Sequence, residues 1–279
     1  MAATRQQIYA APFDAVAEQY DEAFTLSCIG QAQRRAVWRE LARTFRSGDR
    51  TLEIGCGTGA DACFLADRGV RVVACDSSSQ MVAVTARRVQ EGGLQKLVHP
   101  ILLCAEGVST VAANPLFDGA FSNFGVLNCV ENLREFAVGL AGLLRPGAKV
   151  VLCWMGPYCV WEMIWYLASG NQDKAFRRLK RGGVTARLAD GAFVHVRYPS
   201  LRQLSRAFAP EFQLKAVKGI GVAVPPSYVE PWARRHPSLL RLCERVDRAM
   251  GRLPGVRMLA DHLLVRLERR KTAEEIVEQ

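Results

Sequence analysis

What this chain lacks limits the kinds of protein it can be. No apolar run approaches the ~20 residues that a membrane-spanning helix needs, and there is no internal repeat or low-complexity tract. The nine cysteines include no C-x-x-C pair and no cysteine–histidine pair at zinc-ligand spacing, so we expect no metal site. Their odd number and the lack of an apolar leader segment predict a reducing, cytoplasmic location.

Lysine is scarce and arginine abundant, and the formal net charge is +10. The excess lies mainly in the second half, where residues 174–218 carry eleven Lys/Arg against two acids. A basic surface can steer anionic metabolites, nucleic acid or an anionic membrane toward a protein. Arginines at helical spacing can equally form a solvated helix face without any partner. The charge alone leaves both interpretations open.

Strand-like and helix-like periods alternate from residue 29 to about residue 155. The strands are short and nearly all apolar, as in TLEI at 51–54, and residues 131–144 carry a helical apolar stripe. This alternation predicts an α/β fold with a mostly parallel sheet covered on both faces. Beyond residue 155 the pattern loosens. There we expect helical cap insertions over 157–191 and 225–255 and a last sheet strand over 261–269, all within one domain, 1–279.

The glycine-rich stretch 51–69, TLEIGCGTGADACFLADRG, joins a strand to a helix. Glycines there let the backbone turn tightly and bring its amides close to a ligand. With Gly55, Gly57 and Ala60 the stretch fits the G-x-G-x-x-G/A turn of dinucleotide-binding folds. With Glu53 ahead of it and Gly59 as the third glycine, it fits the E-x-G-x-G-x-G turn of enzymes that bind S-adenosylmethionine (SAM).

Three features favour SAM over a dinucleotide. A carboxylate at Glu53 is poorly placed beside a pyrophosphate but suits the ammonium of a methionyl group. The third glycine follows the second by two residues, which opens the turn for a sulfonium ligand. The chain also ends in a strand pair rather than in a second mononucleotide half. With either cofactor Asp76, at the end of the next strand, is placed to accept hydrogen bonds from a ribose diol.

Several stretches together carry a resemblance to a known family. The run EIGCGTGADACFLADRGVRVVACDSSSQMVAVTARR, the upstream FDAVAEQYDEAF, and FDGAFSNFGVLNCV with LAGLLRPGAKVVLC resemble motifs of class I SAM-dependent methyltransferases of the ubiquinone/menaquinone-biosynthesis type. The resemblance covers about residues 12–155. It implies SAM as the cofactor, a SAM-binding core over 12–155, and a Rossmann-like, doubly wound, seven-stranded sheet.

The same resemblance implies a set of SAM contacts. Tyr20 would close over the methionyl carboxylate, and the residues after the fourth strand would line the sulfonium. The family often has an Asp after the third strand that accepts from the adenine amine. Here Cys104 stands at that position, so Glu106 or the backbone must substitute. The implied contacts are Tyr20, Glu53, Gly55, Gly57, Gly59, Asp76, Ser77, Met81, Glu106, Ser122, Asn123 and Phe124.

The expected reaction is methyl transfer, in which the protein chiefly aligns the acceptor with the methyl carbon and excludes water. A general base helps only where the acceptor must lose a proton in the transition state. His99 and His262 lie at strand starts, so we expect them to be structural. The base candidates, which lie in the late segments, are His195, Tyr158, His236 and Tyr198.

The acceptor pocket is expected just after the fifth strand, where Trp154, Trp161 and Trp165 cluster. An aromatic stripe of this kind can also be ordinary core packing. Beside the basic segment KAFRRLKRGG, however, it suits a small hydrophobic or amphiphilic acceptor that is quinone-, lipid- or polyketide-like. Peripheral contact with a membrane surface is then an option.

Two other classes of function stay open. An RNA or other nucleic-acid methyltransferase would use the same basic surface. The fourth strand is followed by SNFG rather than by an N/D-P-P-Y/F motif for a flipped base, which makes nucleic acid the less favoured partner. The third class is a SAM-binding protein without catalytic activity. The oligomeric state is not indicated by any of these features.

Overall fold

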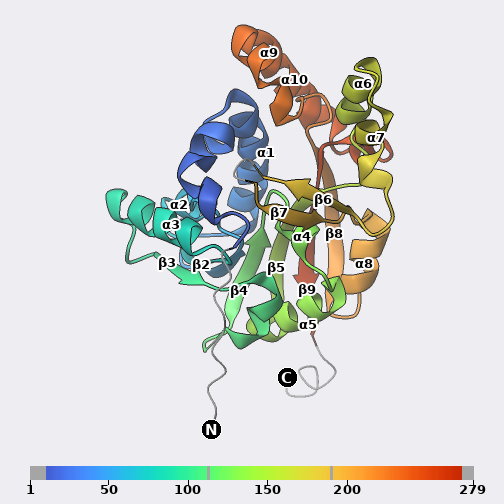
Figure 1. The fold of residues 1–279 in the computed structure, drawn as a ribbon. Helices are drawn as coiled ribbons and strands as arrows, with labels where there is room; N and C mark the ends of the chain where they lie inside the picture. Colours follow the sequence, from blue (N-terminus) through green and yellow to red (C-terminus); the bar gives the residue numbers. More distant parts are fainter. Residues whose placement is uncertain (1–10, 112–113, 189–190, 272–279) are drawn as a thin grey trace.

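The structure is a computed structural model, and it describes residues 11–111, 114–188 and 191–271. Its centre is a seven-stranded sheet with the strand order β3-β2-β1-β4-β5-β9-β8 (Figure 1). The strands β1 to β5 are mutually parallel, and β9 runs antiparallel between β5 and β8. Their bounds are β1 Arg50–Ile54, β2 Arg71–Asp76, β3 Val98–Leu102, β4 Phe117–Ser122, β5 Leu144–Met155, β8 Phe212–Ile220 and β9 His262–Arg269. The predicted mostly parallel, doubly wound sheet is confirmed.

Helices cover both faces of this sheet because the strand side chains are apolar on both faces. On one face α1 (Cys28–Thr44), α2 (Ala60–Ala66) and α3 (Ser79–Glu91) bury Val37, Leu41 and Leu65 against the sheet. On the other face α5 (Leu133–Leu143) and α8 (Leu201–Phe208) bury their own apolar stripes. Successive side chains of β5 point to opposite faces of the sheet. Val151 and Cys153 belong to the core on the α1 face, and Val150 and Leu152 belong to the core on the α5 face.

Trp154 belongs to the α5 layer of this core. Its side chain is fully buried, and its indole Nε1 donates a hydrogen bond to the carbonyl oxygen of Pro199 (2.8 Å). The prediction that Trp154 lines an acceptor pocket is therefore wrong. The period-two alternation of β5 turns this ring away from the C-terminal edge of the sheet and into the layer between β5 and α8.

The late segments form two caps at one end of the sheet (Figure 1). The first cap contains α6 (Val160–Ala168), α7 (Gln172–Ala175), a 3₁₀ turn at Arg177–Leu179, and a hairpin of β6 (Val184–Arg187) and β7 (Phe193–Val196). The second contains a 3₁₀ turn at Ser227–Val229, α9 (Glu230–Arg235) and α10 (Pro237–Met250). It packs on α1, and the carboxylate of Glu230 accepts from the N–H groups of Cys28 and Ile29 at the start of that helix.

Two elements differ from the sequence pattern. Helical structure is predicted over the whole insertion 157–191, but α7 ends at Ala175 and only a 3₁₀ turn follows before the hairpin. The strand β6 was not expected; Gly182 and Gly183 both adopt positive φ (84° and 92°) and turn the chain back into the hairpin. No helix in the described ranges is both long and apolar enough to cross a membrane.

A matched pair of glycine substitutions tests the packing of the sheet. A Cβ at Gly119 in β4 would lie 2.4 Å from a ring carbon of Phe45 and 2.5 Å from the carbonyl oxygen of Lys149. We expect Gly119→Ala to lower the free energy of unfolding by about 1–3 kcal/mol through overpacking. A Cβ at Gly142 in α5 meets nothing within 4 Å among the described residues, so Gly142→Ala should raise it by about 0.5–1 kcal/mol. Urea denaturation measures both values, and equal effects would contradict this packing.

Candidate active site

The glycine turn follows β1 at the C-terminal edge of the sheet. Gly55, Gly57 and Gly59 all have positive φ (72°, 54° and 78°), which glycine adopts without strain. The N–H of Gly55 donates to the carbonyl oxygen of Cys75 (2.8 Å), which ties the turn to β2. A Cβ at Gly57 would meet no described atom within 4 Å, so this side of the turn is open.

Asp76 ends β2 beside the turn and holds it in place. Its Oδ2 accepts from the N–H of Gly57 (2.8 Å) and its Oδ1 from the N–H of Ser78 (2.9 Å). Burial raises the pKa of the Asp76 carboxyl above its ordinary value, and the backbone N–H groups of Ser78 and Gly57 only partly offset that effect. The carboxylate keeps further lone pairs for a ligand.

These elements surround a cavity of about 250 Å³ at the C-terminal ends of β1, β2 and β4. Nine of the twelve implied cofactor residues line it: Tyr20, Gly55, Gly57, Asp76, Ser77, Met81, Glu106, Asn123 and Phe124. Cys104, at the position where the family often has an Asp, also lines it. The remaining wall is mostly apolar and includes Phe13, Leu103, Val126, Cys129, Val130, Met155, Val194 and Val196.

Three implied cofactor residues lie just outside the cavity lining. Ser122 is buried and donates to the carbonyl oxygen of Ile54 (2.8 Å), so it joins β4 to β1. A Cβ at Gly59 would lie 2.7 Å from the side chain of Thr85, so this glycine permits close packing of the turn on α3. Glu53 is buried, and its Oε2 has no hydrogen-bond partner among the described residues.

A group of buried charges lies beside Glu53. Asp61, at the start of α2, accepts from Arg34 (2.5 Å), from Nε1 of Trp38 (2.7 Å) and from Nδ2 of Asn123 (2.9 Å). Burial, with a further contribution from the charge of Asp61, raises the pKa of Glu53 well above its ordinary value. Arg34 and the other neighbours leave Oε2 of Glu53 without a hydrogen bond. A cationic ligand group placed beside this oxygen would pair with the carboxylate and lower its pKa.

The segment before α1 covers the cavity from outside. Asp14 accepts from the hydroxyl of Ser78 (2.6 Å), and Asp21 pairs with Arg88 and accepts from the hydroxyl of Thr58 in the glycine turn (2.7 Å). These contacts hold Tyr20 against the cavity.

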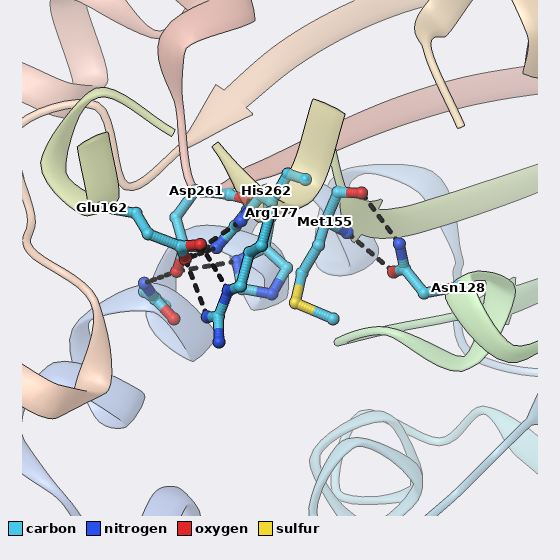
Figure 2. A network of polar contacts seen from close by, with 8 residues as sticks. Asn128, Met155, Glu162, Arg177, Asp261 and His262 are labelled. Atoms are coloured by element: carbon cyan, nitrogen blue, oxygen red, sulfur yellow. Dashed lines mark hydrogen bonds and ion pairs between the residues drawn. The ribbon is translucent and has the colours of Figure 1, made fainter. Parts of the chain in front are cut away.

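Asn128, on the short helix α4 (Val126–Cys129), joins β5 to the first cap (Figure 2). Its Nδ2 donates to the carbonyl oxygens of Met155 (2.8 Å) and Arg197 (2.6 Å), and its Oδ1 accepts from the N–H of Met155 (2.9 Å). Because Arg197 directly follows β7, Asn128 positions the hairpin that places Val194 and Val196 at the cavity.

A second polar network ties the first cap to β9. The carboxylate of Glu162, almost fully buried in α6, accepts from Arg177 (2.7 Å) and Arg178 (2.8 Å). Arg178 also donates to Asp261 (2.7 Å), whose other oxygen accepts from Gln33 of α1 (3.1 Å). Figure 2 labels Glu162, Arg177 and Asp261 of this network, with His262 beside Asp261. Both arginines are therefore paired inside this network, and the buried Arg178 adds no charge to the basic surface that the sequence suggested.

Comparisons with known proteins agree with this geometry. Residues 52–150 match the family described as methyltransferase domain. The demethylmenaquinone methyltransferase of Clavibacter sepedonicus is 34% identical over 145 residues, which make up 51% of this chain and 56% of that protein. The CcbJ methyltransferase from Streptomyces caelestis has the same fold, with a TM-score of 0.61 at 17% identity over 94% of this chain and 99% of that one. The chain therefore contains a match to a methyltransferase domain over residues 52–150 and shares the fold of class I SAM-dependent methyltransferases.

A further relative is named for a tRNA substrate. The tRNA 5-carboxymethoxyuridine methyltransferase of Escherichia coli (strain K12) is 26% identical over 165 residues, which make up 58% of this chain and 62% of that protein. The chain spans about half the length of the first demethylmenaquinone methyltransferases that it matches. The names of these relatives include both a quinone and a tRNA acceptor.

The cofactor is SAM, and the residues present fit it. The open side of Gly57 allows close approach of the ligand to the backbone. Two buried acceptor atoms, Oε2 of Glu53 and Oδ1 of Asn123, have no partner among the described residues. Asp76 would hold the ribose hydroxyls, and Glu53 would attract the methionyl ammonium. Leu103, Cys104 and Ala105 would border the adenine.

The predicted base and acceptor residues do not gather at the cavity. His195 points to the opposite side of β7 from Val194 and Val196, and its Nε2 lies 2.7 Å from the carbonyl oxygen of Gly182. His236 is exposed beside Trp232, between α9 and α10, and Tyr158 is exposed just before α6.

Trp161 and Trp165 are held within the caps. The indole of Trp161 donates to the carbonyl oxygen of Val222 (3.1 Å), and the half-exposed Trp165 packs against Tyr228. Sequence reasoning missed Asn128, the β7 valines and the Glu162 network. The one available signal for the Glu162 network was that Glu162 is the single acid in the aromatic segment VWEMIWYLA. An acid buried in such a segment needs a charged partner.

Two substitutions test the SAM site. We expect Asp76→Ala to weaken SAM binding about 10- to 100-fold, because a charge-assisted hydrogen bond contributes about 1.5–3 kcal/mol. Gly57→Val should abolish binding, because its side chain would enter the cavity. Gly93→Val is the control, since Gly93 also has positive φ (66°) and open space around it but lies outside the cavity. Calorimetry showing unchanged SAM affinity in the first two variants, or tight binding of NAD by the wild type, would contradict the assignment.

Glu53→Gln should separate stability from binding. The raised pKa of Glu53, caused by burial, means that the folded protein holds a proton that the unfolded chain releases. Wild-type stability therefore falls as the pH rises from the ordinary glutamate range through that raised pKa. The variant should lose this dependence, melt at a higher temperature at pH 7 and bind SAM more weakly. Thermal melts between pH 4 and 8 measure the effect, with Glu91→Gln on the exposed end of α3 as control. An unchanged pH dependence would refute it.

Proposed function

We propose that this protein transfers a methyl group from SAM to a small hydrophobic or amphiphilic metabolite by in-line displacement. The observation that carries the proposal is the composition of the cavity. One end has the polar glycine turn and Asp76, and the other wall is built from apolar side chains of α4, β5 and β7. Such a cavity accommodates a polar donor next to an apolar acceptor.

The chain's own residues would act mainly by positioning. SAM supplies an electrophilic methyl group, so alignment of the acceptor can account for about 7–11 kcal/mol of the barrier. Tyr20 and the hairpin valines would exclude water from the two sides of the cavity. Asn128 would keep the hairpin in register with the end of β5.

A quinone-type acceptor is the substrate class that we favour. The relatives named demethylmenaquinone methyltransferases match about half of this chain at 30–34% identity. An acceptor of this class is a flat apolar ring with ionisable hydroxyl groups in its reduced form. Lipid-like and polyketide-like acceptors share the apolar body and remain within the proposal.

A nucleic-acid acceptor is the second candidate, supported by the tRNA-modifying relative and by the net charge of +10. Arg177 and Arg178 weaken this support, because Glu162 and Asp261 already neutralise them. SAM binding without catalysis is the third candidate, and the open glycine turn and cavity give it no specific support. The nine free thiols suit the reducing cytoplasm that we propose as the location.

Contact with an anionic membrane forms part of the proposal. The first cap exposes the large apolar side chains Tyr158, Ile164, Trp165, Leu167, Phe176 and Leu179. Lys174, Lys180 and Arg181 lie in the same part of the chain. Apolar side chains beside cations favour the surface of an anionic bilayer, from which an amphiphilic acceptor could be drawn.

Labelled SAM and a defined set of acceptors test the function. We expect label in 1,4-naphthoquinol bearing an isoprenoid tail, faster from anionic than from neutral vesicles, and no label in bulk tRNA. At limiting SAM, Asp76→Ala should slow this transfer about as much as it weakens SAM binding, and Gly93→Val should retain the wild-type rate. Label in tRNA, with binding that weakens steeply as salt rises, would favour the second candidate. SAM binding without any labelled product from a whole-cell extract would favour the third.

A further inference from the structure

A basic cavity lies on the α1 face of the sheet, away from the candidate SAM site. Its volume is about 230 Å³, and it is formed where the end of α1 meets β5, β8 and β9. Its lining contains the four cations Arg43, Lys149, Lys215 and Arg266 and the single acid Glu268. Cations therefore gather from four elements of the fold around one hollow.

Strand pairing explains why three of these side chains meet. Residues that lie directly opposite each other in antiparallel strands point to the same face of the sheet. Lys149 of β5 pairs with Glu268 of β9, and Arg266 pairs with Val151, which is buried on the α1 face. Because alternate residues of a strand share a face, Lys149, Arg266 and Glu268 all lie on the α1 face. The helix α1 ends at Thr44, which also lines the cavity.

The edge strand β8 adds the next cation through a shift in its register. Leu214 and Ala216 pair with consecutive residues of β9, so Lys215 is an extra residue between them. An extra residue of this kind bends a strand and redirects a side chain. The ammonium of Lys215 lies 3.2 Å from the carboxylate of Glu268. The only acid in the cavity lining is therefore already paired with one of the four cations.

Arg43 also has an acidic partner. Its guanidinium lies 3.3 Å from the carboxylate of Glu40, one turn earlier in α1. The same carboxylate oxygen of Glu40 accepts from the buried Lys218 of β8 (3.1 Å). Glu40 is thus shared between two cations and offsets only part of the charge of Arg43.

Lys149 and Arg266 have no such partner. In the part of the chain that the structure describes, neither side chain makes a hydrogen bond or an ion pair. Arg266 is half-buried, so it has lost some of its contact with water without gaining an acid. A guanidinium in this situation attracts an anion, and its planar fork suits two oxygens of a phosphate group.

The basic cavity is separate from the candidate SAM site and from the first cap. Lys149 precedes Met155 by six residues on β5, and Met155 lines the SAM-site cavity. At about 3.3 Å per residue, these two positions are about 20 Å apart. The first cap follows the C-terminal end of β5 (Figure 1). Segments that lie on a bilayer enter it by only about 5–10 Å, so a membrane in contact with the first cap does not reach the basic cavity.

We propose that the basic cavity binds the phosphate monoester group of a soluble metabolite. A phosphate monoester carries about −1.5 to −2 charges at pH 7, which matches the two cations without a partner, Lys149 and Arg266. Cavities that enclose a whole drug-sized ligand measure about 300–1,000 Å³. The smaller basic cavity suits the phosphate group and leaves the rest of the metabolite outside. The inference goes beyond the proposed function and does not depend on it.

Binding of inorganic phosphate tests the site. Calorimetry is performed on protein saturated with S-adenosylhomocysteine, at an ionic strength held constant with chloride. We expect saturable binding by the wild type and binding about 10- to 100-fold weaker in Arg266→Gln, because a charge-assisted hydrogen bond is lost. Lys149→Gln should also weaken binding. Arg202→Gln is the matched control and should bind as the wild type does, since Arg202 is exposed on α8, which covers the opposite face of the sheet.

Arg266→Lys separates recognition of phosphate from a general effect of charge. This variant keeps the positive charge but loses the planar fork, so its affinity for phosphate should lie between those of the wild type and Arg266→Gln. Thermal melts without phosphate check that each variant is folded. Added phosphate should raise the melting temperature of the wild type and of Arg202→Gln more than that of Arg266→Gln, because only binding to the folded state stabilises it.

Several outcomes would overturn the inference. One is a wild type that shows no saturable binding up to about 10 mM phosphate, tenfold above a Kd of about 1 mM. Another is equal affinity in the wild type and Arg266→Gln, which would place the bound phosphate elsewhere. SAM affinity should be unchanged in Arg266→Gln, and its loss would contradict a separate site. None of these results bears on methyl transfer, so the proposed function is tested independently.

Two further probes decide the source of the phosphate group. Glycerol 3-phosphate should bind with the same dependence on Arg266 as inorganic phosphate. Binding to vesicles that contain phosphatidic acid, without binding of either soluble probe, would assign the site to a lipid headgroup and overturn the inference. Retention on a single-stranded oligonucleotide that depends on Arg266, again without binding of the soluble probes, would assign it to nucleic acid and overturn it as well.

Discussion

The buried carboxylate of Asp61 is the interaction on which the site depends. It lies at the start of α2, directly after the glycine turn, and accepts hydrogen bonds from α1 through Arg34 and Trp38 and from the end of β4 through Asn123. A buried charge without partners would be costly, so these three elements must meet at one point for the fold to be stable. The turn, the end of β4 and the first helix are thereby fixed relative to one another before any ligand binds.

The same arrangement explains why Glu53 is left incompletely satisfied. Arg34 is shared between Asp61 and the faces of Phe24 and Phe124, so Glu53 lies close to a cation without a hydrogen bond from it to Oε2. An unsatisfied buried acceptor lowers the stability of the ligand-free protein. The same acceptor attracts a cationic ligand group. Binding of that group gives the acceptor a partner and so removes the cost of leaving it unsatisfied.

The caps are joined to this core by polar contacts as well as by apolar packing. Glu162, Arg178 and Asp261 connect α6 with β9, and Asn128 connects β5 with the hairpin. Buried networks of this kind add little to net stability, because the cost of removing the charges from water offsets most of their attraction. Their main effect is to favour one arrangement of the caps on the sheet. For the proposed mechanism, which depends on positioning, a single cap arrangement is the relevant result. It would determine the shape of the proposed acceptor side, while the turn would determine the SAM side.

The sequence by itself determined the sheet, its covering helices, the SAM turn and nine of the residues at the cavity. Those features follow from local rules: strand and helix periods, positive-φ glycines, and an acid at the end of β2. It did not determine the acceptor side. Trp154 looked like a pocket residue and is core, His195 faces away from the cavity, and His262 looked structural and lies behind Phe124. Only the tertiary structure decided these cases. The directions of Trp154 and His262 depend on the pairing of β5 with β9, more than a hundred residues apart. The direction of His195 depends on the β6–β7 hairpin and on the contact of Arg197 with Asn128.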